Sequence, residues 1–263
     1  MILFLFLSHL GIGIVFTLLL VSREAGVKFF RFNAGLAGVL IAVALAFRPE
    51  SDGRVIEQVA LVALVVAEGA LVLYWATVGR ALASIRPAIL ATASLGGLLA
   101  LIGQALATAA EWGLAIQGLT VVSFLTSSVF LGGVCTAMIL GHWYLVIPSL
   151  QVSHLQSIVK VHIASIVVRV AVVVAVVAVA IGTWEPGLGP SFQRYIFSVS
   201  GIFFWQRVLF GLLGPAILSY LTWETAKIRS TQSATGILYV DFFTVVVGEV
   251  LAKYLLLEMR VPV

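Results

Sequence analysis

Three of the four histidines, His142, His154 and His162, lie within residues 141–170 of a chain that is otherwise mostly apolar. Imidazole is the usual neutral ligand of haem iron and of many metal ions. We expect the chain to reverse at residues 148–149, so that His142 and His162 both lie about 9–14 Å from the same end of a helical hairpin. This spacing predicts either two axial ligands of a b-type haem or a metal site, with His154 as a candidate third ligand.

Two basic residues close to these histidines suit the propionates of a haem. Arg169 follows His162 by seven residues, which places both side chains on one helical face, and Lys160 precedes that histidine by two. Directly packed helices lie about 8–10 Å apart, which is less than a haem between two histidines requires. The hairpin must therefore splay, or one ligand must come from elsewhere. For His154, hydrogen bonding in the headgroup region is the simpler hypothesis.

Ionisable residues also occur inside the apolar segments: Glu68, Arg169, Arg207, Asp241 and Glu249. A charged side chain at the centre of a bilayer costs about 2.5–3.5 kcal/mol on insertion scales, so each should face protein or water and find a partner. Two hypotheses stay open for this set. The residues either form ion pairs that fix the order of the helices, or they build a proton path or a pocket for a quinone headgroup.

The depths of these charges along their segments predict specific pairs. Glu68 and Arg169 both lie near the middle of their segments, so we expect them to pair. Arg207 is expected to pair with Asp241 or Glu249. Four residues separate Glu249 from Lys253, so this pair can also form within one helix.

The composition predicts the class of protein. Of 263 residues, 62% are hydrophobic and 10% are charged, and the mean hydropathy is +1.17. A soluble domain is about 45–50% apolar and about 25% charged. We attribute the net charge of +4 to basic loops of a membrane protein, so it does not indicate nucleic-acid binding. The single cysteine, Cys135, excludes a disulfide or a cysteine-based metal site within the chain.

A spanning helix needs about 20 mostly apolar residues. In lipid, a single segment can form all of its backbone hydrogen bonds internally only as a helix. We therefore predict an all-α, polytopic integral membrane protein. Its single domain, residues 1–263, is a bundle of eight transmembrane helices with short loops. The predicted spans are 2–21, 30–47, 55–78, 88–109, 119–147, 155–181, 195–223 and 234–257.

The predicted loops also indicate orientation and location. Lys and Arg are more frequent in the loops opposite the termini, which predicts that both termini lie outside a bacterial cytoplasmic membrane. The first segment lacks the basic start and the cleavage site of a signal peptide, so we expect it to be retained.

Three functions fit this sequence. The first is the membrane subunit of a respiratory or photosynthetic electron-transfer complex, binding haem b, a quinone or both, and at most the redox subunit of an oxidoreductase. Such a subunit needs partner subunits in the membrane or on its surface. The second is a proton- or ion-conducting subunit or a transporter that uses the intramembrane Glu and Arg residues. The third is a cofactor-free structural subunit.

Overall fold

The protein is described by a computed structural model that covers residues 1–50, 52–147, 151–183 and 191–263. All regular structure in these ranges is helical, which confirms the predicted all-α class. The long helices are α1 (Ile2–Leu18), α2 (Gly26–Ala46), α3 (Val55–Thr77), α4 (Arg86–Thr108), α5 (Leu114–Val146), α6 (Val152–Gly182), α9 (Gly214–Lys227) and α10 (Thr231–Met259). The short elements are η1 (Arg23–Ala25), α7 (Phe192–Ile196), η2 (Val199–Gly201), α8 (Ile202–Val208) and the π-helix η3 (Leu209–Leu213).

Six helical segments of the described chain are long and apolar enough to cross a membrane, which indicates a membrane-embedded protein. They are Arg23–Ala46, Val55–Thr77, Arg86–Thr108, Leu114–Val146, Val152–Gly182 and Val199–Lys227. The predicted count of eight is not confirmed, since α1 is a shorter apolar helix of 17 residues and α10 is not among the six. The turn predicted at residues 148–149 lies outside the described residues.

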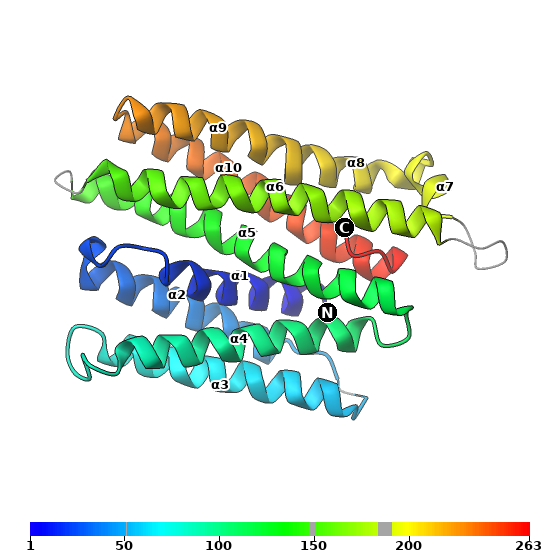
Figure 1. Cartoon of the computed structure of the whole chain (residues 1–263), viewed down its shortest axis with the longest axis horizontal. Helices are drawn as coiled ribbons and strands as arrows, with labels where there is room; N and C mark the ends of the chain where they lie inside the picture. The colour runs from blue at the N-terminus through cyan, green and yellow to red at the C-terminus, as the bar shows by residue number, and fades with distance from the viewer. Residues whose placement is uncertain (51, 148–150, 184–190) are drawn as a thin grey trace.

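The helices run side by side along the long axis of the molecule (Figure 1). One group contains α1 to α4, in which α3 packs on α4 and α1 packs on α2. The other group contains α5, α6, α8, α9 and α10, and the contact of α1 with α5 joins the two groups. Because α6 and α10 each pack against α5 and against α9, they face one another across the middle of the second group.

Glycines allow the closest approach between the two groups. A Cβ atom added to Gly13 of α1 would lie 1.9 Å from the carbonyl oxygen of Ser128 in α5. A Cβ added to Gly132 of α5 would lie 2.0 Å from the backbone of Gly13. Small residues at such contacts let helices pack closely in lipid, where apolar burial gives little driving force. This contact brings the polar residues of α1 beside those of α5.

The helix that carries Arg207 is irregular in its middle. The π-helix η3 lies between α8 and α9, and Gly214 and Pro215 follow it directly. Proline lacks the backbone N–H that would continue the hydrogen-bond ladder, and π-turns occur frequently at functional sites. Gly211 of η3 touches Gly248 of α10, where an added Cβ would lie 2.1 Å from the Gly211 Cα. The irregular turn therefore faces α10.

Candidate functional site

The carboxylate of Glu249 collects three cations inside the bundle. Its Oε1 lies 3.1 Å from Arg169 Nε and 2.9 Å from Arg207 Nη2. Its Oε2 lies 2.9 Å from Lys253 Nζ and 3.3 Å from Arg169 Nη2, and it accepts a hydrogen bond from Ser127 Oγ at 2.5 Å. The side chains of all five residues are buried. We call these five residues the Glu249 cluster.

Four helices contribute to the Glu249 cluster. Arg169 comes from α6, Arg207 from α8 and Ser127 from α5, while Glu249 and Lys253 lie one turn apart on α10. Three cations therefore share one carboxylate in the buried interior, where a charge without a partner is energetically unfavourable. Arginine keeps its proton in proteins, whereas a buried lysine can release it. Lys253 is thus the cation of the cluster that can exchange a proton.

The two arginines differ in how completely they are bonded. Arg169 Nη1 donates to the hydroxyl of Ser123 at 2.8 Å, and its Nη2 donates to the carbonyl oxygen of Val263 at 3.2 Å. Arg207 donates only through Nη2, and its Nε and Nη1 have no hydrogen-bond partner among the described residues. A Cβ on Gly211 would lie 2.1 Å from Arg207 Nη1, so the π-helix leaves space that only glycine permits.

His9 of α1 joins the cluster through a serine hydroxyl. Its Nδ1 lies 3.4 Å from Ser127 Oγ, and its ring packs edge-on against Phe124 at 4.6 Å between centroids. Ser127 Oγ also accepts a hydrogen bond from Lys253 Nζ while it donates to Glu249. A hydroxyl has one donor and two acceptor sites, so this single oxygen can serve all three neighbours.

A second buried pair lies nearer the N-terminal ends of α6 and α10. His162 Nε2 is 3.0 Å from Asp241 Oδ2, and neither side chain is exposed. The imidazole stacks on Phe130, with 5.4 Å between ring centroids and 7° between planes. The second polar atom of each group, His162 Nδ1 and Asp241 Oδ1, has no partner in the described part of the chain. Both ionisable groups therefore keep one atom free for a further hydrogen bond.

The two polar sites are spaced by two helical turns. His162 and Arg169 are seven residues apart on α6, and Asp241 and Glu249 are eight apart on α10. At 1.5 Å per residue this is about 11–12 Å on both helices. Because α6 and α10 face one another, their paired side chains form two polar levels in the middle of the helix group.

The structure does not bring His142 and His162 together. His142 is exposed four residues before the end of α5, where its Nδ1 lies 3.1 Å from Tyr239 Oη. His162 lies ten residues inside α6 and faces Gly133, whose added Cβ would be 3.6 Å from His162 Nδ1. Gly133 and His142 are nine residues, or about 13 Å, apart along α5. The two histidines thus lie at different depths with different partners.

The other residues predicted to hold a cofactor also have partners of their own. His154 Nε2 lies 2.7 Å from Glu24 Oε2. Lys160 lies over the ring of Trp223, 5.1 Å from its centroid. Within the described residues, no group of three or more His, Cys, Asp or Glu side chains is placed to hold one metal ion.

The predicted ion pairs are partly rearranged. Arg207 pairs with Glu249, one of its two predicted partners, and Asp241 pairs with His162 instead. Arg169 also pairs with Glu249, so the predicted Glu68–Arg169 pair does not form. Glu68 lies beside α2, where a Cβ on Gly38 would be 3.5 Å from its Oε1. The depth of Glu68 within its predicted span matches that of Arg169. Equal depth in two helices does not show that these helices are neighbours.

The sequence alone assigned no role to Ser127 or to His9. His9 is fully buried beside α5. An ionisable residue within an apolar segment is a usable signal. Ser127 gives no such signal, because serines are common where membrane helices pack.

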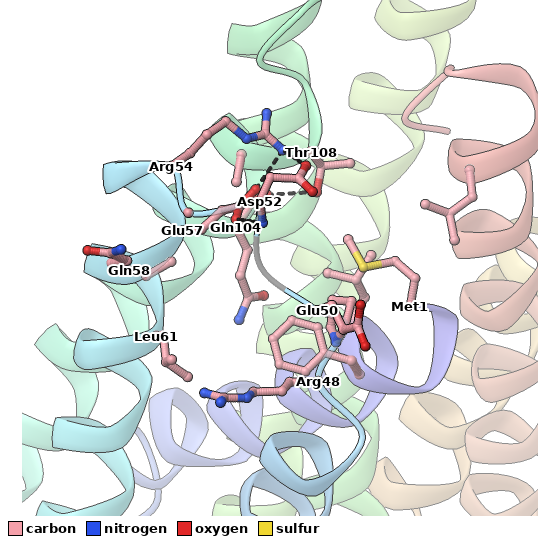
Figure 2. A pocket seen from close by; sticks show the side chains of 17 residues that line it. Met1, Arg48, Glu50, Asp52, Arg54, Glu57, Gln58, Leu61, Gln104 and Thr108 are labelled. Carbon is pink, nitrogen blue, oxygen red and sulfur yellow. Dashed lines mark hydrogen bonds and ion pairs between the residues drawn. The ribbon is translucent and has the colours of Figure 1, made fainter.

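A pocket of about 790 Å³ opens beside the start of α1 (Figure 2). Its walls come from α1, α3, α4, the connection after α2, and Leu257 of α10. Arg54 crosses one wall, with its Nη2 3.3 Å from Asp52 Oδ2 and 2.6 Å from Glu57 Oε1. Gln104 lines the same pocket from α4. The volume lies within the range of about 300–1,000 Å³ that is usual for small-molecule sites.

The functional assignment depends on the geometry of these sites. No protein-family model, no curated protein and no solved structure matches this chain. An all-helical fold alone does not indicate a function, whereas a set of placed ionisable groups does. The Glu249 cluster brings together more ionisable side chains than the other sites described above. The His162–Asp241 pair lies two helical turns away from it.

Proposed function

We propose that this chain moves protons across a membrane, either alone or as the proton-conducting subunit of a transporter or a larger complex. The Glu249 cluster is the central proton-binding site of the path, and the His162–Asp241 pair is a second proton-binding site. One observation carries the proposal: the buried hydroxyl of Ser127 contacts Lys253, Glu249 and His9 at once. Chains of ionisable and hydroxyl groups inside membrane bundles are typical of proton relays.

The groups of the cluster divide into exchanging and fixed members. Lysine, histidine and carboxylate side chains bind and release protons, and a serine hydroxyl passes one on. Arg169 and Arg207 keep their charge and hold the Glu249 carboxylate from two further helices. The arginines therefore position the carboxylate, while Lys253 carries the proton.

The irregular helix gives this site a means to change shape. Membrane transporters often place their sites where spanning helices are interrupted. Arg207 lies two residues before the π-helix η3, and Gly214 and Pro215 follow that π-helix. A small change in this turn moves the Arg207 guanidinium relative to Glu249, which would couple the cluster to movement of the helix.

The proposal includes the finer topology. We place α1 and α10 across the membrane with the other six, which gives a bundle of eight spans in a bacterial cytoplasmic membrane. The charged residues Asp241, Glu249 and Lys253 of α10 are all buried and paired, so they do not face lipid. An even number of spans puts both termini on one face, and the distribution of Lys and Arg supports the outer face.

The haem-binding hypothesis is not part of this proposal. It depended on His142 and His162 acting on one group, and these residues lie about 13 Å apart along the helix axis. A purely structural role for the Glu249 cluster, as a set of ion pairs that orders the helices, remains the alternative that an experiment must separate from proton movement.

Purified protein in liposomes provides the test. Vesicles loaded with potassium and treated with valinomycin develop a negative interior, and an enclosed pH dye reports proton entry. We expect the wild type to acidify the interior faster than protein-free vesicles do, and Lys253→Met to remove most of the difference. Lys227→Met is the matched control, because Lys227 is exposed and paired with Glu224 at 2.6 Å.

Two results would overturn the proposal. One is a wild type that moves protons no faster than protein-free vesicles. The other is a Lys253→Met protein that keeps the wild-type rate. A structural role alone predicts that second result, provided that the variant elutes as a single folded species.

A further inference from the structure

The pocket beside α1 ends one helical turn from the Glu249 cluster. Leu5 of α1 lines the pocket, and His9 follows it by four residues. Leu257 of α10 lines the pocket, and Lys253 precedes it by four residues. Residues four apart lie on the same face of a helix, about 6 Å apart along its axis. Two separate helices thus lead from the pocket to members of the same polar network.

Gln104 provides a polar group between the pocket and this network. It lines the pocket, although its own side chain is nearly buried. Its Oε1 accepts a hydrogen bond from Ser8 Oγ at 3.4 Å, and Ser8 is fully buried next to His9 in the chain. Gln104 Nε2 has no hydrogen-bond partner among the residues that the structure describes.

His9 has the second unpartnered atom of this region. Its Nδ1 faces Ser127, while its Nε2 is buried without a partner in the described ranges. Leaving a buried polar atom without a hydrogen bond costs about 1–3 kcal/mol, and such atoms in proteins are commonly bonded to ordered water. Two of them between a pocket and a charged cluster indicate a route that water can enter.

The rim of the pocket carries charges of both signs. The carboxylates of Glu50, Asp52 and Glu57 lie beside the guanidinium groups of Arg48 and Arg54 (Figure 2). Arg54 is paired with Asp52 and Glu57, so these three groups form a local ion-pair network at the opening. A polar opening of this size has room and partners for water.

We propose that this pocket is the entrance of the proton path, and that protons pass from it along Gln104, His9 and Ser127 to Lys253. This inference rests on the proposed function and adds the side and the route of entry. Water beside Gln104 delivers a proton to His9 Nε2, and the proton on Nδ1 passes to Ser127 Oγ. When Lys253 is a neutral amine, the Ser127 hydroxyl turns from Glu249 to Lys253 Nζ and passes its proton to it, so that Lys253 becomes an ammonium group. Each bond formed is matched by one broken, and no oxidant or reductant is needed.

Thiol labelling tests the water route without any measurement of transport. The native Cys135 is buried, and replacing it by alanine gives a cysteine-free background. In that background we expect a charged methanethiosulfonate to modify Gln104→Cys, as detected by intact mass. The control is Ala93→Cys, three turns away in the same helix, where the side chain is buried in the apolar core. If Gln104→Cys does not fold, Ala107→Cys on the wall of the same pocket replaces it.

Proton flux in the same labelled proteins tests the entrance itself. Modification of Gln104→Cys should lower the flux several-fold, and His9→Leu should lower it without any reagent. Absence of labelling at the pocket positions would overturn the route. Labelling that leaves the flux unchanged would also overturn it, although the proposed function would stand if Lys253→Met still abolishes flux. A wild type without flux would refute the proposed function, and the entrance with it.

Discussion

His162 Nε2 lies 3.0 Å from Asp241 Oδ2, with both side chains fully buried between α6 and α10. Because each group keeps one polar atom unbonded within the described chain, the pair is suited to exchange a proton with a neighbour. We expect Asp241→Asn to lower proton flux several-fold, since an amide keeps the shape and the hydrogen bond but cannot carry the proton. Flux in liposomes measures this, and wild-type flux in a folded Asp241→Asn protein would remove the pair from the path.

Glu249→Gln should destabilise the fold strongly. Removing one partner of a buried ion pair leaves uncompensated charge, which costs about 3–5 kcal/mol, and here three cations lose the same carboxylate. Thermal unfolding in detergent measures the change. The matched control is Glu224→Gln, where the pair with Lys227 is exposed and is worth about 0.2–1 kcal/mol. Equal stability of both variants would contradict the proposed balance of charges.

Lys253→Met should behave in the opposite way to Glu249→Gln. It removes one of three cations around one carboxylate and replaces it with a side chain of similar length, so charge repulsion within the cluster decreases. We expect the unfolding temperature to stay near that of the wild type or to rise. A marked fall in that temperature would show that the cluster needs all three positive charges for folding.

Gly13→Ala should separate α1 from α5. The added methyl group would lie 1.9 Å from the Ser128 carbonyl oxygen, a distance that requires the helix backbones to move apart. The fraction of protein that elutes as a folded species from a size-exclusion column should fall. Gly118→Ala on α5 is the control, because its methyl meets nothing within 4 Å. That change should be neutral, or stabilising by about 0.5–1 kcal/mol, as for alanine at an open position inside a helix.

His142→Ala should leave proton flux unchanged. His142 is exposed, and its Nδ1 bonds Tyr239 at 3.1 Å instead of a member of either polar level. The same liposome assay and an optical spectrum of the protein test this together. Loss of flux in His142→Ala, or a haem band that His142→Ala abolishes, would restore the histidine pair as the functional centre.

The sequence predicted the class of fold and the ionisable residues, because both depend on local properties. Hydrophobic runs of spanning length predicted helices close to their observed bounds, such as 55–78 for α3 and 88–109 for α4. Charged residues in apolar segments stand out against their neighbours, which is why Arg169, Arg207 and Glu249 were singled out.

Partner identity could not be predicted in the same way. Depth along a segment placed Glu68 level with Arg169, but α3 packs on α4 and α2, while α6 packs on α5 and α9. Which helices become neighbours depends on small residues such as Gly13 and Gly132, whose contacts involve distant parts of the chain. The role of Ser127 follows only from that arrangement, since one hydroxyl in a helix carries no sequence signal.

The π-helix at Leu209–Leu213 makes the site depend on the length of the chain as well as on its residues. A single-turn π-segment holds one more residue than the regular helix that would replace it. Deleting Leu213 would replace the wide turn by a regular α-helical one and remove the space beside Gly211 in which Arg207 Nη1 lies. Arg207 would then leave Glu249 although no residue of the cluster had been replaced. The loss of one residue at this place would therefore have the same effect on the site as the replacement of Arg207 itself.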